Sequence, residues 1–141
     1  MKELESCLRL RRKINDIDEK IKTLRAAILS PKNQVITGMP RGGNNDNAIE
    51  RYLVKCEKLQ RRKDILLSHQ KSIWLDIEDK AKAANIPEQD IYLLYLRFVK
   101  GKKWNKCAVK MNKKYGNWNI NKVFRIYRRT LDILSLSCTK N

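Results

Sequence analysis

The side chains best suited to bind a ligand lie in the C-terminal third of this 141-residue chain. Residues 97–129 contain 12 lysines and arginines and no aspartate or glutamate. Within them, residues 121–129 read NKVFRIYRR, with four basic and two aromatic side chains. A dense cluster of positive charges attracts a polyanion. These residues therefore predict a nucleic-acid-binding surface.

Two kinds of contact are expected from this surface. Asparagine and arginine pair with adenine and guanine edges in the major groove, whereas lysines contact phosphates and fix position without reading sequence. Asparagine is equally a helix N-cap, and a single lysine is equally a solvated side chain. The predicted base-reading residues are Asn119, Asn121, Lys122 and Arg125. The predicted phosphate-binding residues are Lys102, Lys103, Lys106, Lys110, Lys113, Lys114, Arg128 and Arg129.

Three short helices are predicted to position these side chains, over residues 90–100, 104 to about 114, and about 120 to 134. The sequence Asn85-Ile86-Pro87 separates them from the N-terminal part. A helix followed by a short turn and a basic helix is the pattern of a helix-turn-helix DNA-binding motif. Residues 86–141 are therefore predicted to form a DNA-binding domain. The side chains predicted to face inward are Ile91, Leu94, Tyr95, Phe98, Trp104, Cys107, Ala108, Met111, Val123, Ile126, Thr130, Leu131 and Leu134.

Residues 1–85 are predicted to form an antiparallel coiled-coil helical hairpin. From Cys7 to Ile28 apolar residues recur in steps of three and four until Ser30-Pro31, and a second such pattern runs from about residue 48 to 84. Residues 31–47, rich in glycine, proline and asparagine, are predicted to be a flexible loop. Lys63 and Gln70 interrupt the seam, which suggests that a further helix or a second copy shares it. The expected fold class is all-α.

Several classes of protein are not expected. The net charge is +17, and no apolar run approaches the ~20 residues of a membrane span, so we expect no membrane partner and a cytoplasmic location. The four cysteines are dispersed and the only histidine is His69, so no metal site or cofactor is expected. Clustered carboxylates, a nucleophile–base pair and a phosphate-binding glycine loop are all lacking, so an enzyme is not expected.

Three segments resemble a known group of regulators. Residues 94–104, LYLRFVKGKKW, resemble the entry of the sigma factor region-4-like helix-turn-helix, and residues 123–134, VFRIYRRTLDIL, are similar to its closing helix. The stretch Met39-Pro40-Arg41-Gly42-Gly43, between two long charged helices, resembles the small phage-encoded and prophage-encoded regulators of Gram-positive bacteria, akin to the late-gene activators RinA and ArpU. The turn KKYGNWNIN is longer than the usual turn of that group.

This resemblance implies a transcription regulator that binds double-stranded phage DNA and activates packaging, structural or lysis genes in a bacterial host cell. Host RNA polymerase and a second copy bound through the coiled coil are the further candidate partners. Two alternatives stay open: a DNA-packaging or assembly protein of the small-terminase type, and a phage inhibitor protein acting on a host nucleic-acid-binding complex. A ring of many subunits would favour packaging, and a monomer or dimer would favour regulation.

Overall fold

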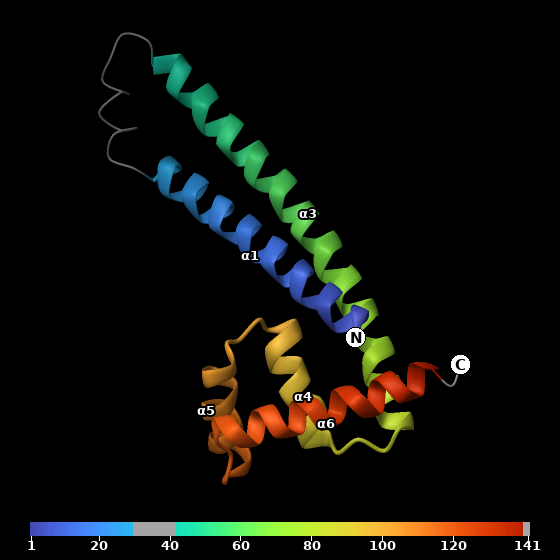
Figure 1. The fold of residues 1–141 in the computed structure, drawn as a ribbon. Coiled ribbons are helices and arrows are strands. Elements are labelled where there is room, and N and C mark those ends of the chain that lie inside the picture. Colours follow the sequence, from blue (N-terminus) through green and yellow to red (C-terminus); the bar gives the residue numbers. More distant parts are fainter. Residues whose placement is uncertain (30–41, 140–141) are drawn as a thin grey trace. The chain divides into compact units, whose positions relative to one another are not determined.

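A computed structural model describes the backbone of residues 1–29 and 42–139 and the side chains of residues 1–29 and 48–136. All regular elements in this part of the chain are helices (Figure 1), which confirms the all-α prediction there. In chain order they are α1 (Lys2–Ile28), α3 (Gly42–Ala83), α4 (Glu88–Leu94), the π-helix η1 (Tyr95–Val99), α5 (Trp104–Tyr115) and α6 (Ile120–Thr139). A membrane span needs ~20 apolar residues, and none of the described helices offers such a stretch.

The helix boundaries differ from the predicted ones at three places. Helix α3 begins at Gly42, so residues 42–47 are helical although they were predicted to belong to the loop; the rest of that loop, residues 30–41, lies outside the described residues. The helix predicted over residues 90–100 begins at Glu88 and is divided into α4 and η1. Helix α6 begins at Ile120 as predicted and continues to Thr139.

The end of α3 follows from its local sequence. Asn85 has a φ of 60°, a left-handed conformation that asparagine tolerates better than most residues. The backbone N–H groups of Asn85 and Ile86 then donate to the carbonyls of Lys82 and Ala81, each at 3.0 Å. This pair of bonds is a Schellman arrangement, which satisfies carbonyls that the helix end leaves free. Pro87 follows at once and prevents continuation of the helix.

The chain divides into two compact units. The first unit consists of Met1–Arg12 and Ser68–Asn141, and the second consists of Lys13–Leu67. Both long helices cross this division. The predicted domain boundary between residues 85 and 86 follows the end of α3, whereas the first unit also takes in the C-terminal part of α3 and the start of α1.

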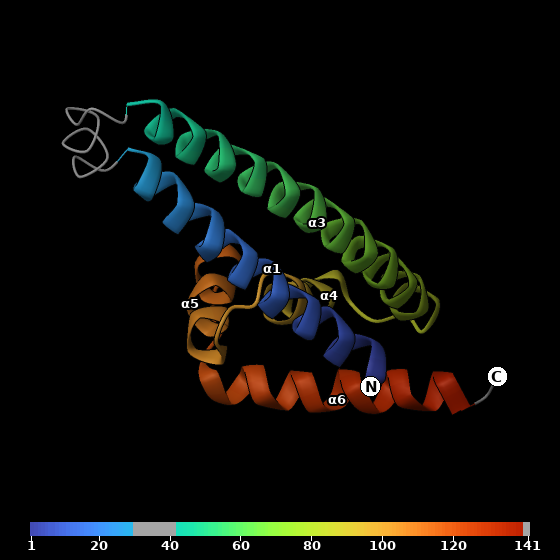
Figure 2. The same cartoon turned by 90° about the horizontal axis from the view of Figure 1, so that it is seen from above.

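In the second unit, α1 and α3 lie side by side (Figures 1 and 2). Ile14, Ile17 and Ile21 of α1 are buried, so this part of the predicted apolar seam does face inward. Lys63 of α3 forms an ion pair with Asp18 of α1, with 2.7 Å between nitrogen and oxygen. Both side chains remain partly exposed, so the pair contributes at most about 1 kcal/mol.

In the first unit, the helix formed by α4 and η1 is buried on two faces. One face joins a cluster with α1, α3 and α6, and the other joins a cluster with α5 and α6. A helix with apolar residues around most of its surface is normally a central one, and the single inner stripe predicted for this segment is therefore incomplete. The first cluster contains Leu4, Cys7, Trp74, Ile77, Ala81, Ile86, Ile91, Leu94, Phe98, Val99 and Leu134. The second contains Leu93, Leu96, Cys107, Ala108, Met111, Trp118, Val123 and Ile126.

Gln70 connects three helices of the first unit through a buried polar network. Its amide nitrogen donates to the carbonyls of Cys7 at 3.0 Å and Val99 at 3.2 Å. Arg11 donates to the same Val99 carbonyl at 2.6 Å and to the Gln70 side-chain oxygen at 3.3 Å. Val99 ends η1, and carbonyls at a helix end need such donors. Thus η1 is a further helix that packs at the α1–α3 seam beside Gln70. The polar residue at this position of the apolar pattern had suggested such a neighbour.

The two described thiols of the first unit, those of Cys7 and Cys107, are structural. Cys7 and Cys107 are fully buried, and burial raises the pKa of the Cys7 thiol to about 11. Burial also raises the pKa of the Cys107 thiol, against the opposing effect of Arg97 and Lys110. A thiol with a raised pKa stays neutral at physiological pH and is a poor nucleophile, so both residues behave as small apolar side chains.

We expect Gly101→Ala to destabilise the protein by about 1–2 kcal/mol, because residues other than glycine are strained at positive φ. Gly101 has a φ of 68°, and a Cβ there would lie 2.7 Å from Cγ of Arg11. Moving Arg11 would also disturb its bonds to Val99 and Gln70. Urea unfolding measures the change. In a protein that carries Arg11→Ala, Gly101→Ala should lower the free energy of unfolding by less than it does in the wild-type protein. Equal losses in the two proteins would contradict the steric clash with Arg11.

Candidate nucleic-acid interface

Helix α6 buries the stripe that the sequence predicted. Val123, Ile126, Thr130 and Leu134 are each less than 7 % exposed. Thr130 satisfies its hydroxyl within the helix, donating to the Ile126 carbonyl at 2.8 Å. Because these four residues recur in steps of three and four, they determine the rotational position of α6 and therefore which side chains point outward.

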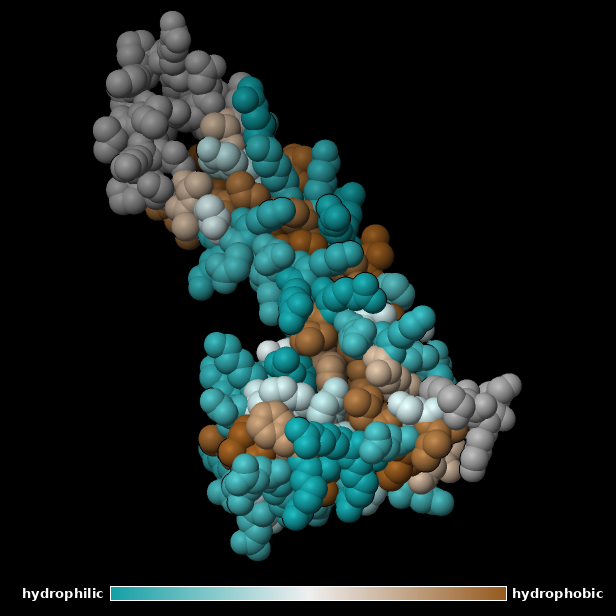
Figure 3. Space-filling view, viewed as in Figure 1, coloured by the Kyte–Doolittle hydropathy of each residue, from teal (hydrophilic) through white to brown (hydrophobic). Residues whose placement is uncertain are grey.

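The outward face of α6 carries Asn121, Arg125 and Arg128, spaced by four and three residues and all exposed. This spacing places them in one row along the helix surface. Within the described part of the chain, none of the three has a hydrogen-bond or ion-pair partner, so their donors are free for a ligand. Hydrophilic side chains cover most of α6 on the face shown in Figure 3, and hydrophobic ones gather toward its C-terminal end.

A turn fixes the start of α6. Gly116, with a φ of 76° and a ψ of 156°, ends α5, and Asn117 follows with a φ of 60°. The Asn112 side-chain oxygen accepts from the backbone N–H of Trp118 at 3.2 Å. The Asn119 side-chain oxygen accepts from the backbone N–H of Lys122 at 2.8 Å, which is the arrangement of an N-cap. The structure thus uses the Asn119 oxygen to begin the helix, and Asn121 keeps its whole amide free.

Lys122 is held beside the turn. Its ammonium lies 4.4 Å from the centre of the Trp118 ring and donates to the Asn117 carbonyl at 3.4 Å. Trp118 is buried in the core, so it supports the turn and does not offer its ring for base stacking. Lys122 must leave these contacts before it can reach a base, and its predicted base-reading role is less direct than that of Arg125.

Arg129 is paired inside the first unit. Its guanidinium donates to the carboxylate of Asp90 at 3.2 Å. The Asp90 side chain is only 6 % exposed, whereas that of Arg129 is 59 % exposed. This pair joins α4 to α6. It therefore gives Arg129 a structural role that the sequence did not reveal, and a phosphate contact would have to use the remaining guanidinium donors.

The predicted phosphate-binding lysines fall into two groups. Lys103, Lys106, Lys110 and Lys113 are exposed, and the last three are spaced by four and three residues, which places them in one row on α5. The other two have contacts within the protein, although Lys114 is also exposed. Lys102 is half-buried, and its carbonyl accepts from Arg97 at 3.1 Å.

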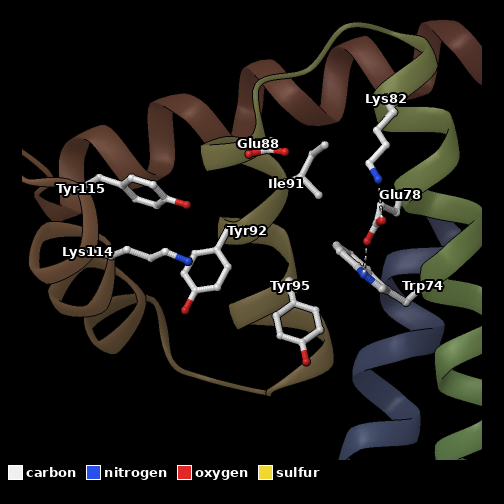
Figure 4. A pocket seen from close by; sticks show the side chains of 9 residues that line it. All are labelled: Trp74, Glu78, Lys82, Glu88, Ile91, Tyr92, Tyr95, Lys114 and Tyr115. Carbon is white, nitrogen blue, oxygen red and sulfur yellow. Dashed lines mark hydrogen bonds and ion pairs between the residues drawn. The ribbon is translucent and has the colours of Figure 1, made fainter.

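Lys114 instead lies at an aromatic cleft of about 300 Å³. Its ammonium is 4.0 Å from the centre of the Tyr92 ring (Figure 4), a cation–π contact. On the opposite side of the cleft, Glu78 accepts from Trp74 at 3.1 Å and from Lys82 at 2.9 Å. The contact to Tyr92 holds Lys114 at this cleft in the free protein. Its predicted phosphate contact would require the side chain to move.

An aromatic cluster supports α6 against the start of α5. The centre of the Trp104 ring lies 4.7 Å from that of Tyr127, 5.6 Å from that of Phe124 and 6.3 Å from that of Phe98. The Arg97 guanidinium lies 5.0 Å from the Trp104 ring centre. Burial raises the pKa of the Tyr127 hydroxyl, which therefore stays protonated. Trp104 packs within the protein, as its apolar spacing predicted.

No family model matches this chain, and neither the curated proteins nor the solved structures include a match to it. Among the described residues, no group of three or more histidine, cysteine, aspartate or glutamate side chains is placed to hold a metal ion. The candidate interface is therefore described by its own geometry: a row of three free polar side chains on α6 and a row of three lysines on α5.

Proposed function

We propose that this chain is a sequence-specific, double-stranded DNA-binding regulator of transcription. In this proposal α5 and α6 form a helix-turn-helix resembling that of sigma factor region 4, and α6 enters the major groove. The observation that carries the proposal is the row Asn121, Arg125 and Arg128, opposite the buried stripe that begins at Val123. Arginine and asparagine are the side chains whose donors and acceptors match guanine and adenine edges.

The charge distribution supports the same proposal. The run of 12 basic residues without an acid covers α5 and the first half of α6, so phosphate contacts can accompany base contacts. The lysine row on α5 is free of internal partners among the described residues. The resemblance to late-gene activators extends the proposal to phage or prophage genes in the bacterial cytoplasm, with α1 and α3 as a coiled-coil hairpin for a second copy or RNA polymerase.

Selection of bound duplexes from a random DNA pool, followed by titration at fixed salt, tests this function. We expect one enriched sequence, bound more tightly than a scrambled duplex of equal length. We also expect the logarithm of the binding constant to fall with the logarithm of salt concentration, by about 0.9 for each phosphate contacted. Equal affinity for every duplex would refute sequence-specific regulation, and a ring of many subunits would favour the packaging alternative.

A further inference from the structure

The row on α6 is bordered by an exposed aromatic ring. Phe124 is 39 % exposed, although phenylalanine is among the residues most often buried. It lies three residues after Asn121 and four before Arg128, so it is their neighbour on the helix surface. It also belongs to the second turn of α6, near the end of the helix that usually meets base edges.

The ring of Phe124 is held in place from one side. Its centre lies 5.6 Å from that of Trp104, with 58° between the ring planes. Trp104 is itself fixed by Tyr127, Phe98 and the Arg97 guanidinium. The part of Phe124 that remains exposed is therefore a rigid apolar surface beside free polar side chains. A side chain that loses little conformational freedom on binding is a favourable contact residue.

Only one major-groove group is apolar. Thymine presents its 5-methyl group there, and phenylalanine is one of the side chains that contact it. Stacking of Phe124 on a base would instead require an unpaired strand, because base faces are covered in a duplex. The neighbouring Asn121 and Arg125 offer donors suited to base edges. The surroundings of the ring therefore favour double-stranded DNA as the ligand over an unpaired strand.

We propose that Phe124 reads a thymine by contact with its 5-methyl group, next to the base pairs read by Asn121 and Arg125. This inference rests on the proposed function, because it requires α6 to lie in the major groove. It adds an apolar determinant to a site otherwise made of hydrogen-bond donors and charges. The bound sequence should therefore contain a thymine whose methyl group matters for affinity.

Deoxyuridine provides the test, because it differs from thymidine only by lacking this methyl group. Each thymine of the selected site is replaced in turn, and the dissociation constant is measured by fluorescence anisotropy. For the wild-type protein we expect one position at which the replacement weakens binding about fourfold, the value of burying one methyl group. For Phe124→Ala we expect no loss at that position, and for Phe124→Leu we expect most of the loss to persist.

The readout is a ratio of two dissociation constants obtained with one protein preparation, so a partly unfolded variant does not distort it. Leu75→Ala is the matched control, since Leu75 is an exposed apolar residue of α3, and it should keep the fourfold ratio. A selected site without a sensitive thymine, a Phe124→Ala protein that keeps the sensitivity, or tighter binding to the single strand would each overturn this inference. Absence of any preferred duplex would overturn the proposed function itself.

Discussion

Arg125→Ala should weaken binding to the selected duplex by about 1–3 kcal/mol, which is about 5-fold to 150-fold in the dissociation constant. The loss should be concentrated at one base pair, because Arg125 is exposed on the outward face of α6 and has no internal partner among the described residues. Affinity for unrelated DNA should change much less, so the variant should discriminate poorly between the selected duplex and a scrambled one. Anisotropy titrations against single-base variants of the selected duplex measure this.

Lys103→Ala is the matched comparison for Arg125→Ala. Lys103 is exposed at the start of α5, and its loss should weaken binding to every duplex alike while lowering the salt dependence by about one phosphate contact. Neither variant should change the melting temperature, since neither side chain holds the fold together. If Lys103→Ala altered base preference and Arg125→Ala did not, the proposed orientation of α6 toward DNA would be wrong.

The sequence was sufficient to predict the buried stripe of α6 because that stripe depends on local periodicity. Val123, Ile126, Thr130 and Leu134 recur with the helical repeat, and no other element is needed to choose their side of the helix. The N-cap role of Asn119 was one of two readings that the sequence allowed, and the position of the turn selected it. The helical state of residues 42–47 was not predicted, because their composition is typical of loops, whereas extending an existing helix avoids the cost of nucleation.

Contacts between residues far apart in the chain were beyond prediction from periodicity. The Asp90–Arg129 pair spans 39 residues, and the bond from Arg11 to Val99 spans 88. A partial signal was present in both cases: Asp90 precedes the buried Leu93 and Leu94 by one helical turn, and Gln70 interrupts an apolar seam. Such signals indicate that a polar residue is buried, but its partner is determined by how the helices pack. Lys114 was assigned to phosphate for the same reason, since its contact with the Tyr92 ring is also tertiary.

Arg129→Ala should lower the free energy of unfolding by about 2–3 kcal/mol, because it leaves the buried Asp90 carboxylate without its cation. Removal of one partner from a fully buried pair costs about 3–5 kcal/mol, and the exposure of Arg129 reduces this value. Arg128→Ala is the matched control: Arg128 is the adjacent residue, is exposed, and has no partner in the described part of the chain. Arg128→Ala should change the free energy of unfolding by no more than about 0.5 kcal/mol. Urea unfolding of the free protein measures both.

A double-mutant cycle with Asp90→Asn separates the ion pair from other effects of Arg129. In the Asp90→Asn background no buried charge is left behind, so Arg129→Ala should cost about 1 kcal/mol or less. Equal costs in both backgrounds would mean that the pair does not stabilise the junction of α4 and α6.

The phosphate contact predicted for Arg129 has a separate readout, because a guanidinium carries five N–H donors and Asp90 occupies only part of them. If Arg129 also binds phosphate, the Arg129→Ala change in the Asp90→Asn background should still lower the salt dependence of DNA binding by about 0.9. A stability loss without that change would assign Arg129 to the fold alone and leave Arg128 as the arginine of this turn that faces DNA.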